Sequence, residues 1–94
     1  MDTEKFIKLV KERIRGFYWS QEGRNVEEKD IYIVWLSKTL QNSKAMASTT
    51  IHDHRYFEIT FNGDKSEMYV DAYKKEYNKA FKVPEAEVVL DGEG

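Results

Sequence analysis

Residues 56–72 read YFEITFNGDKSEMYVDA, and this segment predicts a pair of antiparallel strands. Over residues 56–61 apolar and polar side chains alternate with a period of two, which is typical of a strand with one buried face. Asn62-Gly63 follows at once and is the strongest short-range signal for a β-hairpin, because both residues tolerate positive φ. Residues 67–72 form the returning strand, so the chain contains an antiparallel pair.

The alternation assigns the side chains of this hairpin to two faces. The face expected to lie in the core carries Phe57, Ile59, Phe61, Met68, Val70 and Ala72. The face expected to meet solvent carries Tyr56, Glu58, Thr60, Tyr69, Asp71 and Tyr73.

Two more strands are predicted before the hairpin. Residues 31–40 begin with five β-branched or aromatic side chains, apolar on both faces, which suits a central strand with a helix across one face. Residues 41–44 form a turn, and residues 45–51 form the next strand. The meander is therefore expected to have four strands.

Helical periodicity marks both ends of the chain. Residues 3–19 place apolar side chains on one helical face, with Asp2 or Thr3 as the N-cap. Residues 71–82 are read as a short helix that ends before Pro84. The predicted fold is α+β: an N-terminal helix, a four-stranded antiparallel meander and a short C-terminal helix. Residues 1–83 form one domain, and residues 84–94 are an acidic tail that we expect to be flexible.

Composition excludes several classes of function. The 94 residues include no cysteine, so disulfides, thiolate metal sites and a cysteine nucleophile are absent. The N-terminus is polar, and the longest apolar run, residues 31–36, is too short for a membrane span. We therefore expect a cytoplasmic protein with no membrane partner. The net charge is −2, and without its four tail acids the body carries +2, which is far from the strongly basic face of a nucleic-acid-binding protein.

Chemical motifs are few. His52, Asp53 and His54 are acceptable ligand types for zinc, but histidines two apart on a strand point to opposite faces, so a polar turn is the favoured interpretation. The serines lie in no nucleophile elbow, and no glycine-rich phosphate loop is present. Glu58 and Asp71 could pair for acid–base chemistry, although a turn centred after Gly63 would leave them about one pair apart. We predict neither an enzyme nor a cofactor.

The solvent-facing side of the hairpin is the strongest candidate site. Aromatic rings beside lysines can stack on bases or ligand rings, and the same residues also form ordinary cross-strand pairs. The candidate binding residues are Lys38, Tyr56, Glu58, Tyr69, Asp71, Tyr73 and Lys74.

Two strings resemble a known family. Residues 35–50 read WLSKTLQNSKAMASTT, and residues 56–75 read YFEITFNGDKSEMYVDAYKK. They resemble small, functionally uncharacterised proteins of phages and prophages of Gram-positive bacteria, which have a similar KTLQN turn, NGDK hairpin and DAYKK segment. The resemblance covers residues 30–83. It implies a phage origin and a setting in the bacterial cytoplasm, and it implies no reaction.

The sequence is compatible with two functions. The first is a non-catalytic module that binds an unknown protein, which could be a host factor, or that associates with itself. The second is a binder of nucleotides or single-stranded nucleic acid through the aromatic sheet face.

Overall fold

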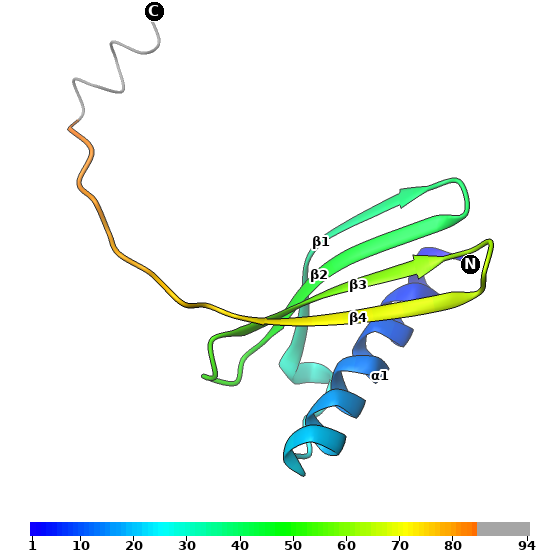
Figure 1. Cartoon of the computed structure of the whole chain (residues 1–94), viewed down its shortest axis with the longest axis horizontal. Helices are drawn as coiled ribbons and strands as arrows, with labels where there is room; N and C mark the ends of the chain where they lie inside the picture. Colours follow the sequence, from blue (N-terminus) through cyan, green and yellow to red (C-terminus); the bar gives the residue numbers. More distant parts are fainter. Residues whose placement is uncertain (85–94) are drawn as a thin grey trace, which may run out of the picture.

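One helix packs on one side of a four-stranded antiparallel sheet (Figure 1). The computed structural model describes residues 1–84. The elements are the helix α1 (Thr3–Glu22), the 3₁₀ turn η1 (Glu28–Asp30) and the strands β1 (Ile31–Thr39), β2 (Asn42–Thr49), β3 (Arg55–Asn62) and β4 (Glu67–Lys74). The strand order β1-β2-β3-β4 is that of a meander, which confirms the predicted α+β fold as far as the N-terminal helix and the sheet.

The helix α1 begins and ends at residues suited to those positions. The Asp2 carboxylate accepts a hydrogen bond from the Lys5 amide at 2.8 Å, so Asp2 is the N-cap. Gly23 terminates the helix with a left-handed φ of 62°, which glycine adopts without steric cost. The helix is therefore three residues longer than the periodicity predicted, because Ser20, Gln21 and Glu22 continue it on the solvent side.

The core lies between α1 and the sheet. The helix contributes one buried stripe at a spacing of four residues, and the central strands contribute alternate side chains. The buried apolar residues are Phe6, Val10, Ile14, Tyr18, Val26, Ile31, Ala45, Ala47, Phe57 and Ile59, and the buried polar residues are Ser43 and Thr49. Phe57 and Ile59 thus occupy the face predicted from alternation, whereas Val70 at the edge of the sheet is still 38% exposed.

A β-bulge in β1 changes the faces of its second half. The pairing with β2 runs from Ile33 opposite Ala47 to Trp35 opposite Met46, so Val34 has no partner. As a result Leu36 turns toward the helix and Trp35 turns away from it. The prediction of a central strand is wrong. Among the strands of residues 1–84, β1 pairs with β2 alone and lies at the edge of the sheet, and its run of apolar residues contains the extra residue of the bulge.

The hairpin of β3 and β4 has a longer loop than the sequence predicted. Asn62 pairs with Glu67, which leaves the four residues Gly63–Ser66 in the loop. The Asn62 side chain accepts hydrogen bonds from the amides of Asp64 and Lys65, and Ser66 takes the positive φ of 53°. The predicted hairpin is therefore confirmed, but its expected turn centre after Gly63 is wrong.

The predicted C-terminal helix requires a correction. Residues 71–74 belong to β4, and residues 75–84 have no regular secondary structure. The β-pairing continues to Lys74 because Tyr73 lies opposite Tyr56 and stacks on it. The second strand also begins earlier than predicted, since the turn is at residues 40–41. The expected acidic tail lies, apart from Pro84, outside the described residues.

Candidate functional site: the open face of the sheet

The side of the sheet opposite α1 is called the open face here, because in the described part of the chain no element covers it (Figure 1). Strand register and alternation give each strand four residues on this side. The open face consists of Tyr32, Trp35, Ser37, Thr39, Asn42, Lys44, Met46, Ser48, Tyr56, Glu58, Thr60, Asn62, Glu67, Tyr69, Asp71 and Tyr73.

Large aromatic side chains are exposed on the open face at both edges of the sheet. On β1, Tyr32 is 49% and Trp35 40% exposed, and on β4 Tyr69 and Tyr73 are 44% and 43% exposed. Tyr73 stacks on Tyr56 of β3, with ring centroids 5.1 Å apart and planes at 16°. Rings held by cross-strand packing offer a preformed contact surface with little conformational freedom left to lose.

The open face is acidic. Its carboxylates are those of Glu58, Glu67 and Asp71, and its one basic residue is Lys44, so its net charge is −2. Lys44 Nζ lies 3.4 Å from a Glu58 carboxylate oxygen. The negative potential of this region, chiefly from Asp71, raises the pKa of the Tyr73 phenol.

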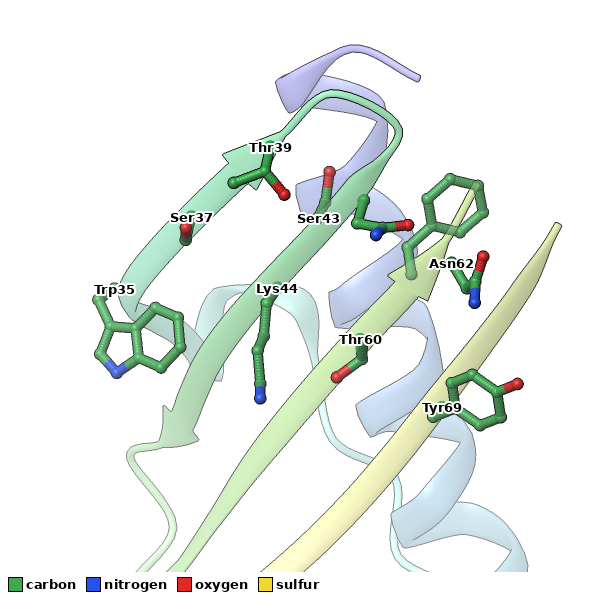
Figure 2. A pocket seen from close by; sticks show the side chains of 10 residues that line it. Trp35, Ser37, Thr39, Ser43, Lys44, Thr60, Asn62 and Tyr69 are labelled. Carbon is green, nitrogen blue, oxygen red and sulfur yellow. The ribbon is translucent and has the colours of Figure 1, made fainter. Parts of the chain in front are cut away.

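A hollow of about 490 Å³ lies on the open face, at the end of the sheet next to the β1–β2 turn and the β3–β4 loop (Figure 2). Figure 2 shows Trp35 and Tyr69 at its two sides, with Lys44 and Thr60 between them. The rest of the lining is Phe61 together with residues that carry hydroxyl or amide groups: Ser37, Thr39, Asn42, Ser43 and Asn62. Such a surface offers two aromatic walls, hydrogen-bonding groups and one positive charge.

Five of the seven predicted binding residues come together on the open face: Tyr56, Glu58, Tyr69, Asp71 and Tyr73. Lys38 does not, because the bulge in β1 puts it on the helix side, where its Nζ donates to the Met1 carbonyl at 2.9 Å. Lys74 also has the parity of the helix side, opposite Arg55. The lysine beside the tyrosines is instead Lys44.

Sequence reasoning missed Trp35 and Lys44. The side of the sheet on which Trp35 lies could not be predicted, because β1 is apolar on both faces and its sequence therefore gives no sign of the bulge. The side of Lys44 could have been found by assuming that Ala45 and Ala47 face the helix, since they alternate with Lys44 and Met46. The direct pairing of Glu58 with Asp71 was missed because the loop is longer than predicted.

A second polar cluster joins α1 to the loop between β2 and β3. The buried Tyr18 hydroxyl donates to Asp53 at 2.6 Å, and the Arg55 guanidinium binds both Asp53 and Glu22. Arg55 also lies over the Phe17 and Tyr18 rings, 5.0 and 5.5 Å from their centroids. Burial, followed by the Asp53 hydrogen bond, raises the pKa of Tyr18. All the polar groups are paired with one another, so this cluster fixes the loop to the helix.

The candidate metal triplet is not assembled. The Asp53 carboxylate is occupied by Tyr18 and Arg55, while His52 and His54 lie in the loop on either side of it. Within residues 1–84 no group of three or more histidine and acidic side chains could hold a metal ion. The same residues contain no helix long and apolar enough to cross a membrane.

Fold and surface define an α+β protein with one helix on one side of an antiparallel meander and an aromatic, acidic open face. The sequence of residues 3–83 matches the family of unknown function DUF6275, so the chain belongs to this family. No curated protein matches the chain. No solved structure matches it either.

Proposed function

We propose that this protein is a non-catalytic protein-binding module and that the open face is its contact surface. The observation that carries the proposal is the exposure of four large aromatic side chains, Tyr32, Trp35, Tyr69 and Tyr73, on a sheet whose other side is packed against α1. Tyrosine and tryptophan are enriched in protein interfaces and dominate their binding energy.

The polar residues of the open face suit such a role as well. Trp35 and Tyr69 stand at opposite edges of the hollow, so a bound segment could contact both rings while it crosses the strands. The carboxylates of Glu67 and Asp71 border this path on β4. A partner segment that carries apolar and basic side chains matches this surface in shape and in charge.

A binder of nucleotides or single-stranded nucleic acid is the second candidate. It is favoured by one observation, the placement of Lys44 between Trp35 and Tyr69, since a base could stack while a phosphate meets the ammonium group. The net charge of −2 on the open face opposes it, because phosphate contacts need positive charge. Protein binding is therefore the better supported function.

The setting in which the module acts is part of the same proposal. The resemblance of residues 30–83 to phage and prophage proteins supports an accessory protein made in an infected or lysogenic bacterial cell, with a partner in the cytoplasm. A host factor and a second copy of the chain are the two partner types that the proposal includes.

The test compares two variants of the full chain. Trp35→Ala/Tyr69→Ala, the face variant, removes exposed rings from the open face, and Trp19→Ala removes a ring that is 66% exposed on α1. Each is used, beside the unaltered protein, to capture partners from a bacterial host lysate and in a measurement of its own mass in solution. We expect the face variant alone to lose association. Equal association of all three proteins would show that the open face is not the contact surface.

Nucleotides and oligonucleotides are tested separately by thermal shift at low salt, where phosphate contacts are strongest. The expected result is no shift in the melting temperature. A shift that disappears in Lys44→Gln, and not in Lys29→Gln on η1, would favour the second candidate instead.

A further inference from the structure

Residues 75–84 form an arm that extends away from the domain (Figure 1). The Lys75 amide donates to the His54 carbonyl at 2.7 Å, so the arm starts in line with β4. Beyond this bond the arm carries three exposed large apolar side chains, with Tyr77 74%, Phe81 70% and Val83 64% exposed. Apolar side chains on a short arm without regular structure indicate a segment that packs against something outside its own domain.

The arm is the chemical complement of the open face. It contains Lys75, Lys79 and Lys82 against Glu76, so its net charge is +2, whereas the open face has −2. Its aromatic residues Tyr77 and Phe81 match the exposed rings of the sheet. Opposite charges steer the encounter, and the rings supply the buried apolar contact.

A second uncovered apolar patch suits the arm less well. It lies on the helix side of β3 and β4, in a hollow lined by Phe61, Met68 and Leu9 of α1. Lys5 and Arg13 also line this hollow. They would repel a segment of net positive charge, whereas the carboxylates of the open face attract it.

The direction of the arm favours a second copy of the chain as the binding partner. Because Lys75 continues the strand, the arm would have to reverse direction immediately to reach the open face of its own sheet. In the observed conformation it projects into solvent, where it can meet another molecule. Ten residues reach up to about 33 Å when extended, which is enough to cross four strands spaced about 4.8 Å apart.

We infer that the arm of one copy lies across the open face of a second copy, and that the exchange is reciprocal, which gives a dimer. The inference rests on the proposed function, since it names the occupant of the same surface. A reciprocal exchange doubles every contact, so each arm supplies only half of the binding energy. The family match includes the arm up to Val83, so this segment is part of the unit that the family shares.

The experiment uses four full-length proteins in measurements of mass in solution against concentration. They are the unaltered chain, the face variant Trp35→Ala/Tyr69→Ala, the arm variant Tyr77→Ala/Phe81→Ala and the control Trp19→Ala. We expect the unaltered chain and the control to form dimers. The face and arm variants should raise the dimer dissociation constant about a hundredfold, since each dimer then loses two pairs of aromatic contacts.

Mixing the two defective variants gives the decisive result. The arm variant has an intact open face and the face variant has an intact arm, so a mixture can form one complete contact. We expect the mixture to form a heterodimer at concentrations at which each variant alone is monomeric. Its dissociation constant should lie between that of the unaltered dimer and those of the two variant homodimers. An arm folded onto its own sheet would give no such complementation and would overturn the inference.

A charge exchange provides a second test that removes no aromatic ring. Lys79→Glu/Lys82→Glu in the arm should weaken the dimer about tenfold, and Glu67→Lys/Asp71→Lys on the open face should restore it when both are combined. Failure of the combination to recover affinity would overturn the inference. So would an arm variant that dimerises as well as the unaltered chain, because the sheets would then pack directly on each other.

The two proposals fail differently. If the unaltered chain is a monomer at every concentration, the arm exchange is wrong, while the open face can still bind a host protein in the capture experiment. If the face variant equals the unaltered chain in both self-association and capture, the proposed function itself is wrong.

Discussion

Glu58 on β3 lies directly opposite Asp71 on β4, so two carboxylates face each other across neighbouring strands of the open face. Like charges in this position destabilise a sheet. Lys44 approaches Glu58 at 3.4 Å from the other side and compensates part of the repulsion. The pair therefore keeps the open face acidic at some cost in stability.

Asp71→Lys should stabilise the isolated fold, because the new side chain places opposite charges across β3 and β4. We expect the free energy of unfolding to rise by about 0.2–1 kcal/mol, measured by urea denaturation at low salt. Asp64→Lys in the exposed loop is the control for net charge and should change little. An equal rise in both variants would attribute the effect to net charge, and no rise in either would mean that Lys44 already neutralises the pair.

Tyr18→Phe tests the cluster that fixes the loop between β2 and β3 to α1. The substitution removes a 2.6 Å hydrogen bond to Asp53 and keeps the buried ring. The free energy of unfolding should fall by about 1–3 kcal/mol, since the Asp53 carboxylate loses a donor in a partly buried place. Tyr32→Phe, at a half-exposed position on the open face, is the matched control and should be nearly neutral. Equal effects of the two substitutions would show that the Asp53 contact contributes nothing.

The same residue predicts how stability depends on alkaline pH. The folded protein raises the pKa of Tyr18 above its ordinary value of 10.0, chiefly through burial. The folded state therefore holds this proton more tightly than the unfolded state, so its contribution is complete below pH 10 and is lost as the pH rises through the higher pKa of the folded state. Denaturation curves across that range should show a steeper loss of stability for the unaltered chain than for Tyr18→Phe. Parallel losses would contradict the prediction.

The prediction of the fold succeeded where the two sides of an element differ in polarity. The hairpin alternation correctly assigned Phe57 and Ile59 to the core, and the stripe on α1 correctly marked that helix. It failed for the second half of β1, because a strand apolar on both sides gives no sign of an extra residue at Val34. The side predicted for Lys38 was consequently wrong, and Trp35 was not recognised as a residue of the open face.

The C-terminal segment shows a different limit. Tyr73, Tyr77 and Phe81 recur at a spacing of four, which predicts one face of a helix, but a short helix is stable only when that face is packed. In the structure Tyr73 pairs with Tyr56 instead, and the arm has no such support from its own domain. Local periodicity cannot show which packing partner is available.

Gly63→Ala should destabilise the protein for a reason that its backbone angle does not reveal. A Cβ atom at this position would lie 2.1 Å from the Gln41 carbonyl oxygen, because the β3–β4 loop passes against the β1–β2 turn. One of the two turns must move, and we expect a loss of about 1–3 kcal/mol in the free energy of unfolding.

Gly16→Ala provides the matched control for Gly63→Ala. A Cβ at Gly16 meets nothing within 4 Å, and the residue lies inside α1, so the substitution should stabilise the protein by about 0.5–1 kcal/mol. Opposite signs for the two substitutions in thermal denaturation would support the close approach of the turns. A neutral Gly63→Ala would show that the loop has room to shift.

Tyr69→Ala combined with Tyr73→Ala separates a binding surface from a structural one. Both rings are more than 40% exposed on the open face, so their removal should cost about 1 kcal/mol or less, chiefly the stacking of Tyr73 on Tyr56. Association through the open face should nevertheless weaken at least tenfold, since aromatic side chains dominate such contacts.

Phe57→Ala is the contrasting variant on the same sheet. Phe57 is fully buried and contacts the rings of Phe17 and Tyr18 edge to face, so its truncation should cost about 3–5 kcal/mol. In a chain of 94 residues this is a large share of the total stability. Circular dichroism and thermal melting on both variants distinguish the two roles. If the tyrosine double variant melts as early as Phe57→Ala, the two tyrosines support the fold, and its loss of association no longer identifies a binding surface.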